Sequence, residues 1–395
     1  MFSAVHSDRA GRVYVSADWG ACAFDGDRTI QIDTVIPLPE DSTLVPLMRE
    51  AEGLDRHGRA RPLGPSRWAL GAVLPPGFTR TLHPAYRDEG LREPPLAALP
   101  TAAVCADDAG ALYVAAIPTR AVAPSPDAHD ASAVPGVPEE ALARTREGNR
   151  LARQLSRCAR EYACAGARGA LQASGVAALP VSARSNESPP PVVAPRARPD
   201  AAPRDAAAFR PSAAEIAEVA LAHFAAGGEA VSFGRACEGE PLTAVRLLED
   251  AISRIREAVP GARIHLETNG SSGSALRRLI DAGLNEVTVR LASARSDTYD
   301  TLHGPISYRY TDVRSTLAMA RDSGARITLV VLVLPGLTDR PRELEALTAL
   351  AAETGAAVEL RDLGADARRA LGLIGRGEAP RGMDAAVASL LEGVA

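Results

Sequence analysis

Lysine is absent from this chain of 395 residues, because all 44 of its basic residues are arginine. This absence excludes catalysis through a lysine Schiff base and phosphate binding by a P-loop lysine. Acidic residues number 49, and the formal net charge is −5. The chain therefore lacks the basic field that nucleic-acid binding requires, and we expect no nucleic-acid partner.

Cysteine is scarce, and the residues present are scattered: Cys22, Cys105, Cys158, Cys164 and Cys237. No CxxC pair occurs, which excludes zinc ribbons and thioredoxin-like redox motifs. The N-terminus lacks the basic start and apolar core of a signal peptide, and no apolar run is long enough to cross a membrane. We therefore expect a cytoplasmic protein with no membrane partner.

Short apolar runs of strand length recur in the second half of the chain. They cover residues 229–234, 262–269, 286–293, 326–335 and 357–363. The segments between them have helical periodicity. It is clearest in Val245, Leu248, Ile252, Ile255 and Val259, which share one helix face. Alternating strands and helices predict βαβ units, right-handed crossovers and a parallel sheet or barrel.

Charged and polar side chains alternate with apolar ones along three of these runs. They include His265, Glu267, Arg290, Glu359 and Arg361. With the two-residue period of a strand, one sheet face packs on helices and the other gathers these groups. Burying such charges without partners is costly, so we expect them to pair, to face water or to hold a ligand. A self-satisfied network of ion pairs without function is the alternative.

Glycine and polar residues mark the carboxyl ends of these runs, where ligands bind in parallel α/β folds. The ends carry residues 237–241, 268–270, 290–293, 334–336 and 361–362. In this order they resemble the landmarks of the radical S-adenosylmethionine (SAM) superfamily. Those landmarks are Glu-Gly-Glu-Pro (238–241), Thr-Asn-Gly (268–270), Ser293 followed by Asp-Thr-Tyr-Asp and His-Gly (297–304), and Leu-Pro-Gly-Leu-Thr-Asp (334–339).

The resemblance covers residues 179 to about 363 and implies a partial (β/α)6 TIM-like barrel that binds SAM and a 4Fe-4S cluster. It implies a cofactor-binding set of Glu238, Gly239, Glu240, Pro241, Asn269, Arg290, Ser293, Pro335 and Arg361. In the family, residues 238–241 would receive the methionyl amino group. Arg290 and Ser293 would lie near the ribose and carboxylate, and residues 333–336 and 361–363 beside the adenine.

The chain departs from the family where the first strand should lead into Cys-x-x-x-Cys-x-x-Cys. The three cysteine positions hold Ser185, Pro189 and Val192. Iron–sulfur clusters need thiolate or imidazole ligands, and none of these residues supplies one. The sequence therefore predicts a degenerate radical-SAM homologue whose ligand is SAM or a related nucleoside, with a protein partner as a further option.

We divide the chain by composition into a β-rich domain (1–122), a Pro/Ala/Asp linker (123–138), a helical connector (139–178) and the barrel (179–395). Residues 182–210 have almost nothing to bury, which predicts a disordered loop. In the first domain, residues 4–15 and 103–114 share a pattern that predicts two hairpins turning at Asp-x-Ala-Gly. We expect one small sheet in which these first and last hairpins of the domain pair with each other, with residues 66–74 between them.

Two alternative functions stay open at this point. One is an active enzyme of the same superfamily with an unusually ligated cluster, for which Cys158, Cys164 and Cys237 would have to converge. The other is a barrel enzyme in which His265 and neighbouring carboxylates support metal- or phosphate-assisted chemistry.

Overall fold

The computed structural model describes residues 2–88, 95–119, 148–162, 164–172, 175–194, 207–235 and 238–392. The linker expected at 123–138 and Cys237 lie outside the described residues. No helix of the described part has the length and apolarity needed to cross a membrane.

The N-terminal part is a β domain that closes on itself, as the repeated hairpin pattern predicts. The hairpins are β1 (Ser3–Ser7) with β2 (Val13–Gly20), and β12 (Thr101–Ala106) with β13 (Leu112–Val114). β1 also pairs with β12, and β9 (Trp68–Val73) pairs with both. Both turns use an aspartate, Asp8 or Asp107, whose carboxylate accepts two backbone N–H groups.

A further hairpin with the same turn chemistry was missed in the sequence. It joins β7 (Glu52–Leu54) to β8 (Ala60–Pro62), and Asp55 accepts the N–H groups of His57 and Arg59. The remaining strands of this domain are β3 (Cys22–Phe24), β4 (Thr29–Gln31), β5 (Ile36–Pro37), β6 (Thr43–Glu50), β10 (Phe78–Arg80), β11 (His83–Pro84) and β14 (Ala116–Pro118).

The C-terminal part is built on a six-stranded parallel sheet whose strands lie in chain order. The strands are β15 (Val176–Ala178), β17 (Ala230–Phe233), β18 (Arg263–Thr268), β19 (Glu286–Leu291), β20 (Arg326–Val333) and β21 (Ala357–Asp362). The α/β architecture and the five predicted strands are confirmed. Among the described residues β15 and β21 do not pair with each other, so the sheet stays open.

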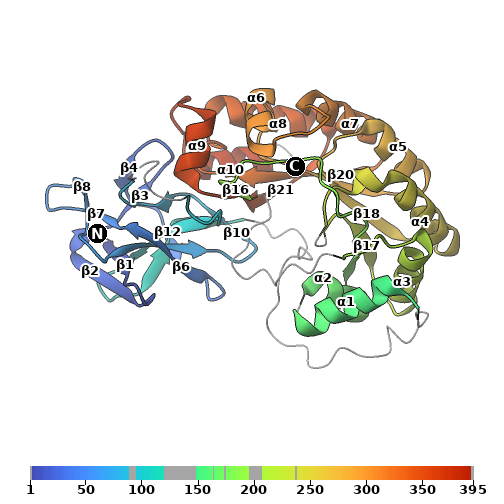
Figure 1. Cartoon of the computed structure of the whole chain (residues 1–395). Helices are drawn as coiled ribbons and strands as arrows, with labels where there is room; N and C mark the ends of the chain where they lie inside the picture. Colours follow the sequence, from blue (N-terminus) through green and yellow to red (C-terminus); the bar gives the residue numbers. More distant parts are fainter. Residues whose placement is uncertain are drawn as a thin grey trace.

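Helices cover the outer side of this sheet (Figure 1). They are α3 (Ala213–Ala225), α4 (Val245–Ala258), α5 (Gly273–Asp281), α6 (Ser296–His303), α7 (Tyr310–Asp322) and α8 (Pro341–Thr354). The predicted apolar face of α4 buries Leu248, Ile252 and Ile255 completely. The outward side chains of the strands, such as Ile264 and Val289, are equally buried in this core.

A second apolar cluster covers the inner face of the sheet at β20. Leu332 and Leu334 pack there with Leu363 and with Phe24 of the N-terminal domain. The segments β16 (Val193–Ala194), β22 (Gly364–Ala365), α9 (Ala367–Ile374) and α10 (Met383–Glu392) complete the C-terminal part. The open inner face is thus confined to the region of β17, β18 and β19.

The predicted helical connector differs from the structure at its C-terminal end. It contains α1 (Arg150–Glu161) and α2 (Ala165–Gln172), but residues 176–178 form β15, the first strand of the sheet. The parallel sheet therefore begins three residues before the predicted boundary at 179. The strand has only three residues, two of them alanine, so it lacks the β-branched signature of its neighbours.

Candidate functional site

The deepest polar layer on the inner face is a ladder across three neighbouring strands. Ser232 Oγ lies 2.7 Å from His265 Nδ1, and His265 Nε2 lies 2.8 Å from Thr288 Oγ1. Burial lowers the pKa of His265 to about 3, so its ring is neutral. Both ring nitrogens of His265 thus have a hydroxyl group as hydrogen-bond partner, and we assign this histidine a structural role.

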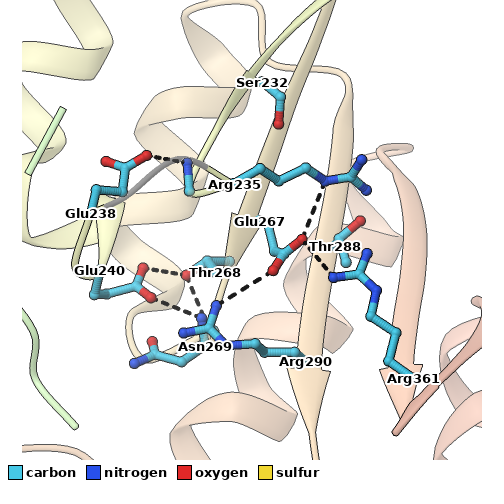
Figure 2. A network of polar contacts seen from close by, with 12 residues as sticks. Ser232, Arg235, Glu238, Glu240, Glu267, Thr268, Asn269, Thr288, Arg290 and Arg361 are labelled. Carbon is cyan, nitrogen blue, oxygen red and sulfur yellow. Dashed lines mark hydrogen bonds and ion pairs between the residues drawn. The ribbon is translucent and has the colours of Figure 1, made fainter. Parts of the chain in front are cut away.

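The next layer toward the carboxyl ends centres on Glu267, as Figure 2 shows. Its carboxylate accepts from Arg235 Nε and from Arg361 Nη1, each at 3.2 Å. Arg290 Nη1 lies 3.8 Å away, and Arg361 Nε donates to Glu359 at 2.7 Å. The charged side chains that were predicted to share one face of the sheet do lie together, and most of them form hydrogen bonds or ion pairs with one another.

The Glu-Gly-Glu-Pro loop uses both of its carboxylates internally. Glu240, 1% exposed, accepts hydrogen bonds from Thr268 Oγ1 and Asn269 N (Figure 2). It also accepts one from Leu242 N. Burial raises the pKa of this carboxyl, although these three donors favour its charged form. Glu238 accepts from backbone N–H groups on both sides of the loop, at residues 181, 182 and 234.

Residues 182–194, called the strap below, run across the carboxyl ends of β17 and β18. Gly239 N donates to Ser182 O, and Glu240 N donates to Arg184 O, both at 2.7 Å. A Cβ at Gly239 would overlap the carbonyl of Arg184, so only glycine allows this approach.

The strap continues past β18 to the end of α6. Asn269 Nδ2 donates to Asn186 Oδ1 at 2.8 Å, and Ile306 N donates to Asn186 O at 2.8 Å. Beyond this point Ser188 N bonds Gly304 O, and β16 pairs with β22. The strap is thus bound to four separate elements of the C-terminal part.

These contacts correct the prediction of a disordered loop at 182–210 for the part that the structure describes. The prediction rested on the small amount of apolar surface in this segment, whereas backbone hydrogen bonds and buried polar side chains hold residues 182–194 in place. Residues 195–206 lie outside the described residues.

Glu187 is the strap residue that enters the site. Its side chain is 7% exposed, and its carboxylate lies 3.6 Å from Arg290 Nη2 and 3.2 Å from His303 Nδ1. Tyr308 donates its hydroxyl proton to the same carboxylate at 2.9 Å. His303 Nε2 accepts from Ala292 N, so the ring proton sits on Nδ1 and points at Glu187.

Burial alone would raise the pKa of the Glu187 carboxyl. The hydrogen bonds from His303 and Tyr308 and the charge of Arg290 outweigh burial and hold this pKa at about 2. The carboxylate is therefore charged at neutral pH. Nothing in the sequence pattern singled out Glu187, because it lies in a segment without periodicity.

Arg290 is the least satisfied charge in the site. It is 7% exposed, and its Nε and Nη1 atoms have no hydrogen-bond partner among the described residues. Its ion pairs with Glu187 and Glu267 are long, at 3.6 and 3.8 Å. A buried guanidinium with open donors is suited to an additional anionic or hydrogen-bond-accepting group.

The other residues of the predicted cofactor set are engaged elsewhere. Ser293 Oγ donates to the buried Glu343 on α8. The carbonyl of Pro335 accepts from His83 Nε2 of the N-terminal domain at 2.9 Å. Pro241 begins the short 3₁₀ helix of residues 241–244. The structure therefore groups Glu240, Asn269, Arg290 and Arg361 around the strand ends, and places Ser293 and Pro335 against other elements.

The N-terminal domain docks at the carboxyl ends of β20 and β21 (Figure 1). Arg80, completely buried, donates to the carbonyl of Leu363 at 2.6 Å and lies 3.8 Å from Asp362. Gly26 and Gly336 approach so closely that a Cβ on either would overlap the other. The segments 333–336 and 361–363, which the resemblance places beside adenine, are covered by this domain.

The described residues do not fit an iron–sulfur cluster. Ser185 is exposed and bonds within the strap, Pro189 is half-buried, and Val192 packs on the inner apolar cluster. Cys158 and Cys164 pack against the apolar core. No group of three His, Cys, Asp or Glu side chains in the described part could hold a metal ion. The hypotheses of an unusually ligated cluster and of a metal site at His265 gain no support from these residues.

The family model described as "Radical SAM superfamily" matches residues 198–347. Among solved structures, methylornithine synthase (PylB) is 12% identical, with a TM-score of 0.40 over 64% of this chain and 71% of that one. SuiB of Streptococcus suis bound to its precursor peptide SuiA is 12% identical, with a TM-score of 0.36 over 47% and 38%.

A radical SAM methyltransferase from Sphaerobacter thermophilus is 17% identical, with a TM-score of 0.31 over 42% of this chain and 55% of that one. The chain covers 38% of SuiB. No curated protein matches the sequence.

Proposed function

Residues 198–347 belong to the radical SAM superfamily. From this premise we propose that the chain is a cluster-free, non-catalytic member whose strand-end site is closed by its own strap. In this proposal the open parallel sheet is the partial (β/α)6 barrel of the family. A cytoplasmic location belongs to the same proposal.

The strap is the observation that carries the proposal. The family holds its 4Fe-4S cluster in the segment after the first strand, and SAM binds to that cluster. Here that segment has no thiolate, and it is bonded across the strand ends instead. Its Glu187 carboxylate supplies a negative charge to Arg290 from within the protein. The ligand-binding edge of the sheet is therefore occupied in part by the chain itself.

Retained SAM binding at this edge is a second candidate, and Arg290 is the observation that favours it. The two donor atoms of Arg290 that have no hydrogen-bond partner among the described residues, and the neighbouring carboxylate of Glu240, are the kinds of group that bind an amino-acid moiety. Two features argue against SAM binding. Glu187 would have to be displaced from its partners, and the N-terminal domain covers residues 333–336.

Calorimetric titration of SAM into the full chain separates the two candidates. The proposal predicts no heat of binding, because the strap and the N-terminal domain occupy the contacts that SAM needs. Binding at micromolar affinity, about −8 kcal/mol, that is lost in Arg290→Gln would establish the second candidate instead. The control is Arg254→Gln, which removes an exposed arginine paired with Asp250 on α4.

A further inference from the structure

A cavity lies between the N-terminal domain and the segment around α9. Its volume is about 460 Å³, which is within the range of small-molecule sites. The turn after β3 forms one wall, and the start of α8 and the segment from α9 to residue 380 form the other. The cavity shares Gly336 with the strand-end segments, and none of Glu240, Asn269, Arg290 or Arg361 lines it.

Arg368, on α9, is held in this wall by two aromatic rings from the other domain. Its guanidinium carbon lies 4.1 Å from the centre of the Phe24 ring and 4.8 Å from that of Tyr86. Such contacts fix a guanidinium by its faces and leave its edge for hydrogen bonds. Yet Nε of Arg368 is buried and has no hydrogen-bond partner in the described part of the chain.

Arg340 is fixed in the same wall by backbone carbonyls. It donates to Gly336 O at 2.6 Å and to Gly375 O at 3.2 Å. A Cβ at Gly377 would come within 2.7 Å of its Nη1 atom, so glycine at this position lets the loop lie on the guanidinium. The side chains of Arg340 and Arg368 are thus both held in fixed positions in the wall of the cavity.

Arg376 brings a third positive charge to the cavity, and no described residue forms a hydrogen bond or ion pair with it. The lining also includes the carboxylates of Asp27 and Glu378. Glu378 is paired with Arg342 at 2.9 Å, so the lining holds three arginines and one further carboxylate, that of Asp27. The positive charges of these arginines repel one another unless an anion binds between them.

We propose that this cavity binds a small organic phosphate monoester, with Arg340, Arg368 and Arg376 around the phosphate. Guanidinium groups suit phosphate because their paired N–H donors match its oxygens, and a dianion balances the excess charge. The side chains of Leu371 and Pro380 in the lining offer an apolar wall for the organic part. Because both domains line the cavity, the bound ligand would also strengthen their junction.

The test uses glucose 6-phosphate as the probe, and phosphorus NMR of the full chain at low salt as the readout. We expect saturable binding that is at least tenfold weaker in Arg376→Gln and only partly restored in Arg376→Lys, which keeps the charge but loses the paired N–H donors. Arg376 lies on an exposed loop, so these variants are expected to fold. Arg254→Gln is the matched control and should bind like the unmodified protein.

Inorganic phosphate is measured in the same way, and glucose, which has no phosphorus, is measured by its ability to displace bound glucose 6-phosphate. Weaker binding of both than of glucose 6-phosphate supports the proposal. Equal binding of inorganic phosphate would mean an adventitious anion only, and no saturable binding, or equal affinity in Arg376→Gln, would overturn the site. None of these results depends on SAM or iron, so the proposed function of the strand-end site stands or fails separately.

Discussion

The carboxylate of Glu187 and the guanidinium of Arg290 lie 3.6 Å apart, and less than a tenth of either side chain is exposed. One comes from the strap and the other from β19, more than a hundred residues later. The pair therefore joins the strap to the third strand of the β17–β19 region of the parallel sheet.

Replacing Glu187 by Gln should lower the free energy of unfolding by about 3 kcal/mol, because a buried arginine loses a charged partner. Denaturation with urea measures the change. The control, Glu257→Gln, removes an exposed carboxylate on α4 and should stay within about 0.5 kcal/mol of the unmodified chain. Equal losses in both variants would contradict the assigned role of the strap.

Replacing Gly336 by Ala should destabilise the junction of the two domains. Gly336 has a φ of +84°, and an added Cβ would overlap the backbone of Gly26. Gly324→Ala is the matched control, because Gly324 has a φ of +73° and open space around its Cβ position. We expect the control to cost about 1 kcal/mol for backbone strain and Gly336→Ala to cost roughly 1–3 kcal/mol more. Thermal unfolding of both variants tests the difference, and equal costs would refute the close approach.

Arg80→Leu should loosen the docking of the N-terminal domain. The change removes the donor to Leu363 and leaves Asp362, whose side chain is 10% exposed, without its cation, at a cost of about 3–5 kcal/mol. Calorimetry should then resolve two unfolding transitions where the unmodified chain gives one. Arg61→Leu, at an exposed position of β8, is the control and should leave the transition unchanged. A single transition of unchanged midpoint in Arg80→Leu would rule out the docking contact.

Asp339 should make the chain less stable as the pH rises from about 4 to 6. Burial raises the pKa of its carboxyl from 3.8 to about 6. The native state therefore binds more protons than the unfolded state within this window, and its stability falls by about 3 kcal/mol as the pH crosses it. Below and above the window the contribution is constant.

The variant Asp339→Asn does not titrate, so the difference in unfolding free energy between the two proteins should change over that window and be flat elsewhere. Urea denaturation at a series of pH values measures it. A difference independent of pH would mean that the carboxyl of Asp339 has an ordinary pKa in the folded protein.

Periodicity predicted the parts of the fold that repeat. The five strands from 230 to 362 and the apolar face of α4 follow from two-residue and 3.6-residue patterns, and these patterns depend on local geometry. The hairpins at Asp8 and Asp107 were predictable because aspartate and glycine specify the turn. β15 was missed because three residues, two of them alanine, carry too little pattern.

The site was predictable only in part. Polar alternation indicated that Glu267, Arg290 and Arg361 share a face, which the structure confirms. Their pairing depends on long side chains from separate strands, and no local pattern encodes it. Glu187 and Arg80 escaped prediction for the same reason, because their partners lie far along the chain.

The most direct test of a cluster-free site is the content of iron and acid-labile sulfide after anaerobic reconstitution of the full chain. The account predicts neither element beyond background and no visible thiolate-to-iron absorbance band, because the strap supplies no thiolate. Stoichiometric iron and sulfide with that band, both lost in Cys237→Ala, would contradict it and would establish a cluster held by other cysteines.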